Sequence, residues 1–265
     1  MRPRLIASDL DGTLLRSDGT LDEHSRRVLA EVERAGAVLV LCTARPVRWM
    51  SPAAEATGHR GVAICANGAV VWDLHSETVR REWPLEPAVA REVVALLRAA
   101  LPEAAWAVER TDGFAHEPGY TPLWPTPAET IVDAVDALVS RPAVKLMLRH
   151  NGVSADELLE RAREIVGDLA ELTHSSSADV LLEISAAGVS KGSALVRLCE
   201  EYGVSSREVI AFGNMPNDLP MLQWAGHAVA VANAHPDVLA VADEVTADND
   251  HAEVARVLER VFELA

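Results

Sequence analysis

The sequence predicts an α/β protein with a parallel sheet, because short aliphatic runs alternate with segments of helical periodicity. Five of these runs stop at a polar or glycine-containing cluster: Leu5–Ser8, Ala37–Cys42, Gly61–Cys65, Leu181–Ile184 and Val209–Phe212. Continuous apolar runs are typical of strands that are buried on both faces of a sheet. Helical patterns lie between most of them, which is the alternation expected of a parallel sheet.

The N-terminal segment supplies the first strands and a capped helix. Asp22 is a suitable N-cap for a helix near Ser25–Arg34 that ends at Gly36. A hairpin is expected between Val70 and Trp83, with residues 73–77 as its turn.

The pattern then changes to that of a separate α+β layer. The expected elements are helix Pro87–Ala100, strands near Trp106 and Phe114, helix Ala128–Leu138, strand Val144–Leu148, helix Ser154–Val166 and strand Val180–Ile184. We therefore expect an inserted domain, residues 84–187, and a core domain formed by residues 1–83 and 188–265.

After the insertion, strands and helices alternate again. The expected elements are helix Ser193–Glu201, strand Val209–Phe212, helix Leu219–Trp224, strand Ala228–Val231, a helix from Pro236, a strand at Val245 and helix Ala252–Glu263.

The composition describes a globular protein that does not bind nucleic acid. Of the 265 residues, 49% are hydrophobic, which is enough for a core of normal size, and the formal net charge is −16. Nucleic-acid affinity comes mainly from Lys and Arg side chains, so this charge argues against such a partner. The same charge repels anions at long range, so a phosphate ester would need a local cation.

Cysteine usage and the N-terminus indicate a cytoplasmic protein. Cys42, Cys65 and Cys199 are odd in number and widely spaced, as is typical of buried apolar side chains in a reducing compartment. The first apolar run is too short for a signal peptide or a membrane span. We expect no disulfide and no membrane contact, and the sequence leaves the oligomeric state open between monomer and homodimer.

Two carboxylates, Asp9 and Asp11, follow the first strand. Side chains at i and i+2 can share one pocket, where one Asp attacks phosphorus while the other, beside a like charge, keeps a proton. The alternative is a strand end with an Asp-capped turn. Thr43, Asn214 and Asp218 follow other predicted strands, and the carboxyl ends of parallel strands meet at one edge of a sheet. This convergence favours a phosphoryl-transfer site.

Four motifs, in this order, resemble those of the haloacid dehalogenase superfamily of phosphatases: Asp9-Leu10-Asp11-Gly12-Thr13, Thr43-Ala44-Arg45, Lys191-Gly192 and Gly213-Asn214-x-x-Asn217-Asp218. The insertion between the second and third motifs, preceded by Ala66-Asn67-Gly68-Ala69, is similar to the α/β type IIB cap of the Cof-like branch. The resemblance spans the whole chain. It implies a Rossmannoid core with a parallel sheet and an inserted cap that selects the substrate.

The resemblance also implies a role for each site residue. Asp9 is expected to attack phosphorus and form an aspartyl-phosphate, and Asp11 to protonate the leaving alcohol and then deprotonate the hydrolytic water. Thr43 and Lys191 complete the expected catalytic set by binding the phosphoryl oxygens. The expected phosphate- and substrate-binding residues are Thr43, Ala44, Arg45, Asn67, Lys191 and Asn217.

Mg²⁺ is the implied cofactor, because it prefers oxygen ligands. The expected ligands are Asp9, the main-chain carbonyl of Asp11, Asn214 and Asp218. The family commonly has an Asp where this chain has Asn214, so one negative charge is lost and weaker Mg²⁺ binding is expected. The sequence leaves open whether Asn214 or Asp218 is the direct ligand.

In the insertion, residues 118–127 combine several prolines with Tyr120 and Trp124. This composition suits either packing on a sugar or a stiff loop that is pinned by a buried Trp124. The histidines of the insertion are expected to be ordinary core or surface residues rather than substrate ligands: His116, His150 and His174.

The implied function is a Mg²⁺-dependent phosphatase of small phosphorylated metabolites, with sugar phosphates as the expected class. One alternative is a dedicated sugar-phosphate enzyme, such as mannosyl-3-phosphoglycerate, sucrose-phosphate or trehalose-phosphate phosphatase, or a phosphomannomutase. The other is a catalytically weak module that binds phosphometabolites, which only Asn214 favours. The sequence does not identify the physiological ester.

Overall fold

The structure is a computed structural model that describes residues 2–176 and 180–264. The chain divides into two compact units. The core unit runs to Arg81 and resumes at Ser190, and the cap unit extends from Glu82 to Val189.

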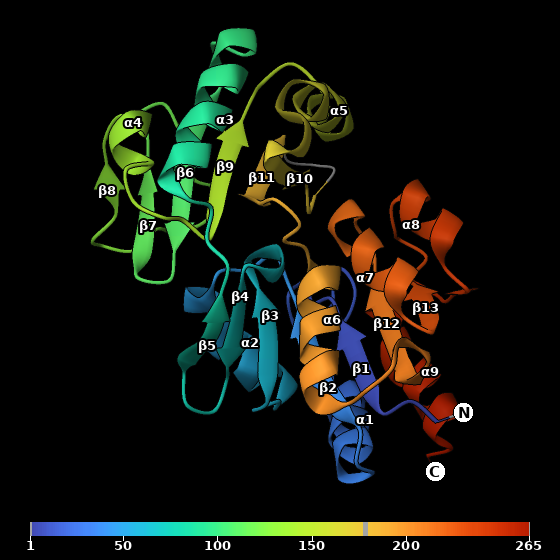
Figure 1. Cartoon of the computed structure of the whole chain (residues 1–265). Coiled ribbons are helices and arrows are strands. Elements are labelled where there is room, and N and C mark those ends of the chain that lie inside the picture. The colour runs from blue at the N-terminus through green and yellow to red at the C-terminus, as the bar shows by residue number, and fades with distance from the viewer. Residues whose placement is uncertain (1, 177–179, 265) are drawn as a thin grey trace. The chain divides into compact units, whose positions relative to one another are not determined.

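The core unit is built on an eight-stranded sheet in the order β14-β13-β12-β1-β2-β3-β4-β5 (Figure 1). The strands are β1 Leu5–Ser8, β2 Val38–Cys42, β3 Val62–Cys65, β4 Val70–Asp73, β5 Thr78–Glu82, β12 Val209–Gly213, β13 His227–Ala230 and β14 Glu244–Val245. The neighbours from β14 to β3 pair in parallel, and β4 pairs antiparallel with β3. β1 and β12 are completely or almost completely buried, as their continuous apolar sequences predict. The α/β class with a parallel sheet is confirmed.

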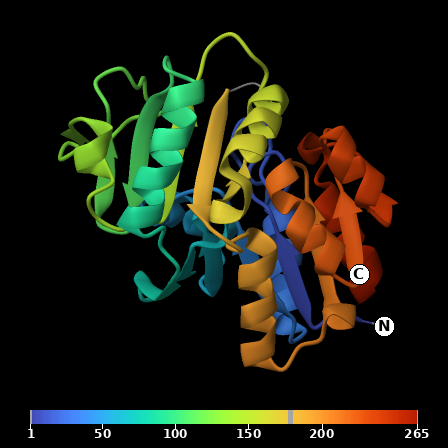
Figure 2. The ribbon, with the colours of Figure 1, turned by 45° about the horizontal axis from the view of Figure 1, so that its top comes forward.

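Helices of the core unit cover both faces of this sheet. They are α1 Glu23–Arg34, α2 Met50–Thr57, α6 Lys191–Tyr202, α7 Leu219–Trp224, α8 Pro236–Val241 and α9 Glu253–Phe262. Figures 1 and 2 show α6 in front of the sheet and α1 behind it. α6 packs against α7, and α1 against α9. The predicted cap of α1 is confirmed, because the Asp22 side chain accepts a hydrogen bond of 2.8 Å from the Ser25 amide.

The sheet topology brings the ends of four strands together at one edge, which is the candidate site. β1, β2, β3 and β12 are adjacent and parallel, so their carboxyl ends lie side by side. Each of these ends is followed by a residue that the sequence singled out: Asp9, Thr43, Asn67 and Asn214.

The cap unit has its own sheet and its own apolar core. The sheet runs in the order β10-β11-β9-β6-β7-β8. Its elements are α3 Pro87–Ala100, β6 Ala105–Arg110, β7 Gly113–His116, β8 Ile131–Val132, α4 Val135–Leu138, β9 Lys145–Arg149, α5 Ala155–Val166, β10 Ala170–Thr173 and β11 Leu181–Ala186. Alternate strand residues, among them Trp106, Leu146 and Ile184, pack with apolar residues of α3 and α5. The apolar cluster around these two helices is formed by cap residues alone.

Two local predictions in the cap were wrong. The helix expected at Ala128–Leu138 is the short strand β8 followed by the single turn α4. Ile131 and Val132 are β-branched, which favours a strand, and they pair with the edge strand β7. β10 was not predicted, although it pairs antiparallel with β11 through Ala170–Thr173. A run of four residues carries too little periodicity to be recognised without its partner.

The expectations for cysteines and membrane spans can be compared with the structure. Cys42, Cys65 and Cys199 are buried and free, so the expectation that they form no disulfide is confirmed. Over residues 2–176 and 180–264, no helix combines the length and the hydropathy that a bilayer span requires.

Gly68 is a point of close approach between the loop after β3 and the start of α6. Its φ is +104°, and a Cβ added to it would overlap the main-chain carbonyl oxygen of Ser190. Only glycine combines this backbone conformation with the absence of a side chain. The residue therefore fixes how closely this loop lies to Lys191.

We expect Gly68→Ala to lower the free energy of unfolding by more than about 3 kcal/mol, because steric overlap adds to the cost of positive φ. Chemical denaturation measures this change. Gly19→Ala is the matched control, since Gly19 also has positive φ but no atom lies within 4 Å of its added Cβ. That control should lose only about 1–2 kcal/mol. Equal losses in the two variants would contradict the close-approach argument.

Candidate active site

A buried cluster of three charged groups lies at the carboxyl edge of the core sheet. The Lys191 ammonium donates hydrogen bonds to Asp9 Oδ1 at 2.7 Å and to Asp218 Oδ1 at 2.6 Å. Lys191 and Asp218 are completely buried, and Asp9 is 5% exposed. Lys191 is the first residue of α6, Asp9 follows β1, and Asp218 ends the short 3₁₀ turn Pro216–Asp218. Residues about 200 positions apart thus meet, as the strand ends predict.

The cluster shifts the pKa values of its members. The pKa of Asp9 is raised to about 7: burial raises it most, the attraction of Lys191 opposes this, and the charges of Asp218 and Asp11 add to the rise. Burial alone would lower the pKa of the Lys191 ammonium, but Asp218 and Asp9 outweigh it and raise that pKa. Lys191 therefore stays charged, and it is the group that favours the ionised form of Asp9.

Asp218 also fixes the backbone of the loop after β12. Its second carboxylate oxygen, Oδ2, accepts hydrogen bonds from the main-chain amides of Asn214 at 2.9 Å and Met215 at 3.0 Å. A Cβ at Gly213 would lie 2.6 Å from Asp218 Cβ, so the strand must end in glycine for the carboxylate to reach this position. Both oxygens of Asp218 are therefore engaged within the protein.

Asp11 is the exposed carboxylate of the site. Arg45 donates two hydrogen bonds to it, at 2.8 Å from Nε and 2.6 Å from Nη2, and 57% of the Asp11 side chain is exposed. This bidentate geometry is the strong form of a charged hydrogen bond. Burial would lower the pKa of the Arg45 guanidinium, but the bonds to Asp11 raise it overall.

The turn after β2 places Thr43 and Arg45 at the same edge. Thr43 is buried, and its Oγ1 accepts a hydrogen bond of 3.0 Å from the Arg45 amide. Ala44 lies between them and is partly exposed. The Asn67 amide donates to the Thr43 carbonyl at 3.1 Å, and Asn217 Nδ2 donates to Asn67 Oδ1 at 3.0 Å. These contacts bring five of the six predicted binding residues, all but Lys191, into connected loops.

The oxygen atoms of Asp11 and Asn214 are suitable ligands for a hard cation. Asn214 is 6% exposed, and its Oδ1 has no hydrogen-bond partner within the described part of the chain. Its Nδ2 donates to the Asp11 carbonyl at 3.3 Å. If the Asn214 side-chain amide is turned over, Oδ1 and Nδ2 exchange places and Oδ1 faces the Asp11 carbonyl oxygen. A cation would stabilise this arrangement of two acceptors. Together with the Asp9 carboxylate this is an all-oxygen donor set, as Mg²⁺ prefers.

The sequence reasoning did not identify Asn233. Its Nδ2 donates to the Gly12 carbonyl at 2.9 Å, and its Oδ1 accepts from the Asn249 amide at 3.1 Å, so it supports the turn that carries Asp11. Gly12 itself has φ +74°, and a Cβ there would lie 2.5 Å from Asn214 Nδ2. Asn233 follows β13, and applying the strand-end rule to that strand as well would have found it.

The cap aromatics differ from one of the two expectations. Trp124 is 51% exposed, so a loop pinned by a buried Trp124 is wrong. Tyr120 is the buried aromatic of this stretch, and its ring lies 6.4 Å from Phe114 and 5.8 Å from His116. Arg149 stacks 6.0 Å from the Tyr120 ring.

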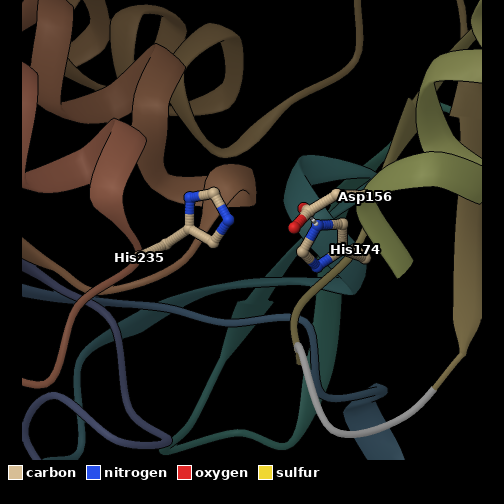
Figure 3. A group of neighbouring side chains, drawn as sticks. All are labelled: Asp156, His174 and His235. Carbon is tan, nitrogen blue, oxygen red and sulfur yellow. Dashed lines mark hydrogen bonds and ion pairs between the residues drawn. The ribbon is translucent and has the colours of Figure 1, made fainter. Parts of the chain in front are cut away.

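One cap histidine forms a close pair with a carboxylate. His174 is completely buried, and its Nε2 lies 2.7 Å from Oδ1 of Asp156, which is in the first turn of α5 (Figure 3). His235, also drawn in Figure 3, belongs to the core unit, where its Nδ1 caps α8 by accepting from the Asp237 amide at 3.2 Å. Within the cap, the pair links β10 to α5, which is a structural role.

Comparison with known proteins agrees with this geometry. The family model of haloacid dehalogenase-like hydrolases matches residues 6–258. Pyridoxal phosphate phosphatase YbhA of Escherichia coli is 30% identical over 270 residues, covering 97% of this chain and 98% of the relative. The 5-amino-6-(5-phospho-D-ribitylamino)uracil phosphatase YcsE of Bacillus subtilis is 25% identical over 257 residues, covering 96% and 94%.

A solved structure shows the same fold. BT1666 of Bacteroides thetaiotaomicron, from a study of phosphatases of the haloalkanoate (HAD) enzyme superfamily, has a TM-score of 0.83 at 24% identity, covering 98% of this chain and 96% of that one. The match extends over both units. The resemblance inferred from the four motifs is confirmed, and the chain belongs to the haloacid dehalogenase-like hydrolases.

Proposed function

We propose that this chain is a Mg²⁺-dependent phosphatase that hydrolyses small, sugar-like phosphate esters through an aspartyl-phosphate. The observation that carries the proposal is the Asp9–Lys191–Asp218 cluster beside the Asp11–Arg45 pair. Two named relatives are phosphatases of small metabolites, and the ribityl chain in the name of one is a polyol. These names support the substrate class and leave the individual ester to experiment.

Asp9 is the nucleophile of the proposed reaction. Its carboxylate oxygen forms a bond to phosphorus while the ester P–O bond breaks, and the leaving oxygen takes a proton from Asp11. Lys191 favours the ionised Asp9 before attack. The ammonium and the Thr43 hydroxyl are proposed to bind the phosphoryl oxygens. Water then attacks phosphorus, the bond between phosphorus and the Asp9 carboxylate oxygen breaks with its electron pair returning to Asp9, and Asp11 accepts the proton of the water.

Arg45 couples phosphate binding to the availability of Asp11. In the structure its guanidinium holds both oxygens of Asp11. A phosphate dianion competes for the same donors, because planar guanidinium groups bind phosphate and carboxylate in the same bidentate way. Binding of the ester then releases Asp11 to carry and transfer a proton.

The residues that would hold Mg²⁺ are Asp9, Asp11 through its carbonyl, and Asn214. Asp218 is assigned instead to positioning Lys191 and the loop after β12, because both of its oxygens are engaged. When bound, the cation supplies positive charge to the phosphoryl oxygens. Among the five side chains Asp9, Asp11, Arg45, Lys191 and Asp218, three are acidic and two basic, so a divalent cation is also needed to make the site attractive to a dianion.

The cap unit is proposed to select the leaving group. Its separate apolar core allows its strands and loops to vary without disturbing the catalytic loops of the core unit. Phosphate release from a panel of phosphorylated metabolites, with and without Mg²⁺, tests the function. Release from one sugar phosphate alone would favour a dedicated enzyme, and no release from any ester would contradict the proposal.

Asp9→Asn should abolish turnover, because an amide cannot form the acyl-phosphate. The fold should persist, since Lys191 keeps Asp218 as its partner and the remaining pair is neutral. Phosphate release and circular dichroism measure the two effects. Hydrolysis near the wild-type rate would contradict covalent catalysis.

The same variant reports on the raised pKa of Asp9. The folded-state pKa is about 7 and the ordinary value is 3.8, so the proton that the folded state retains stabilises it below pH 3.8. This contribution is lost as the pH rises towards 7. In EDTA, Asp9→Asn should therefore unfold at a higher temperature than the wild type, and its gain should be larger at pH 8 than at pH 5. A larger gain at pH 5 than at pH 8 would contradict this sign.

Asn214→Asp should lower the Mg²⁺ concentration for half-maximal activity about tenfold, or about 1.4 kcal/mol, because it restores a charge beside the cation. Activity against free Mg²⁺ at fixed substrate and pH measures the shift. Ala232→Asp, which adds a charge at an exposed position after β13, is the control and should leave the titration unchanged. Superimposable curves for wild type and Asn214→Asp would mean that position 214 does not set metal affinity.

Replacement of residues 82–189 by a short Gly-Ser linker should leave a core that unfolds cooperatively, because the core sheet and its helices are complete without the cap. This core should hydrolyse p-nitrophenyl phosphate but discriminate less between large and small esters. The ratio of kcat/KM values for a small and a large ester measures discrimination. A folded core with unchanged discrimination would place substrate selection outside the cap.

A further inference from the structure

Two buried asparagines join loops that lie 150 positions apart in the sequence. Asn217 Nδ2 donates a hydrogen bond of 3.0 Å to Asn67 Oδ1. Asn67 lies in the turn after β3 and Asn217 in the turn after β12, and they are 3% and 5% exposed. Asn67 has φ +57°, a conformation that asparagine adopts more readily than most residues. We refer to Asn67 and Asn217 as the amide pair.

The amide pair has two unused polar atoms. Within the described part of the chain, neither Asn67 Nδ2 nor Asn217 Oδ1 has a hydrogen-bond partner. If both amides were turned over, Asn67 would donate to Asn217, and one donor group and one acceptor would again remain. The unused set is therefore the same in either assignment. Buried polar groups that have no partner within the protein are commonly satisfied by a water molecule or a ligand.

Only some ligands match one donor and one acceptor. A phosphoryl oxygen accepts hydrogen bonds, so it would satisfy the amide N–H and leave the carbonyl oxygen facing an anion. A metal cation would satisfy the carbonyl oxygen and repel the amide N–H. A water molecule both accepts and donates hydrogen bonds, so water suits an unused atom of either kind and keeps further O–H and lone-pair capacity.

The surroundings of the amide pair belong to the catalytic loops. The Asn67 main-chain amide donates to the Thr43 carbonyl, and the Ala66 amide donates to the Arg45 carbonyl at 2.9 Å. Asn217 precedes Asp218, whose carboxylate holds Lys191. The turn that carries Asn67 is thus bonded to the turn whose arginine holds Asp11.

We propose that the amide pair positions the water that hydrolyses the aspartyl-phosphate. This inference rests on the proposed function. The water oxygen forms a bond to phosphorus, the bond between phosphorus and the Asp9 carboxylate oxygen breaks, and its electron pair returns to Asp9. Asp11 takes the proton of the water. Because the amide pair lies in the core unit, it serves this second step for every leaving group.

Asn67→Gly tests the proposal, because glycine keeps the left-handed conformation and removes the amide. Rapid mixing with p-nitrophenyl phosphate separates nitrophenol release, the first step, from phosphate release, the second. We expect nitrophenol release within about threefold of the wild-type rate and phosphate release slower by about tenfold to a hundredfold. Quenched mixtures should contain more phosphate on Asp9 than the wild type.

Asn249→Ala is the matched control, because Asn249 is another buried asparagine, whose Nδ2 donates to the Leu15 carbonyl at 2.9 Å. It should lower stability without changing the ratio of the two rates. Asn217→Ser provides a second test and is used alone if Asn67→Gly does not fold. Equal slowing of both steps, or a higher KM with both rates intact, would overturn the inference and indicate phosphoryl binding. Absence of phosphate on Asp9 in the wild type would instead overturn the covalent route itself.

Discussion

The Lys191 ammonium between two buried carboxylates is the interaction on which the active-site edge depends. It joins the end of β1, the start of α6 and the turn after β12, three segments that are distant in the sequence. A buried cation is costly unless it is paired and hydrogen-bonded, and here Asp9 and Asp218 supply both requirements. Loss of Lys191 would leave two buried acids side by side, so both the stability of this edge and the proposed chemistry depend on the cluster.

Functional demand and stability oppose each other at Asp9. Its pKa is raised by burial, and this means that the ionised form is less stable in the folded protein than in water. The proposed reaction needs that ionised form as a nucleophile, and the Lys191 ammonium is the group that favours it. Asp11 has the opposite environment, because it is exposed and bound by Arg45. Asp9 and Asp11 thus have different surroundings, which suits the different roles proposed for them.

Backbone close approach sets the precision of the loops around this cluster. Gly12, Gly68 and Gly213 lie where an added Cβ would collide with Asn214, Ser190 and Asp218 respectively. The amide groups of asparagines then cross-link the same loops, through Asn233 on Gly12 and through Asn217 on Asn67. Asparagine can donate and accept without adding charge, which suits a site that already holds three carboxylates.

The sequence by itself determined the fold class, the order of the core strands along the chain and which charged residues to propose for the site. These follow from local signals, namely aliphatic runs that end in polar clusters, and from the rule that parallel strands end at one edge. Tertiary structure decided what local signals do not contain. Ile131 and Val132 form a strand because they pair with the edge of β7. Of the two aromatic residues in the proline-rich stretch, Tyr120 is buried and Trp124 is exposed. The Asp218 carboxylate accepts hydrogen bonds from Lys191 and from two main-chain amides, whereas the Asn214 side chain contacts the Asp11 carbonyl. These partners depend on distances between residues that are far apart in the chain, so local sequence signals do not contain them.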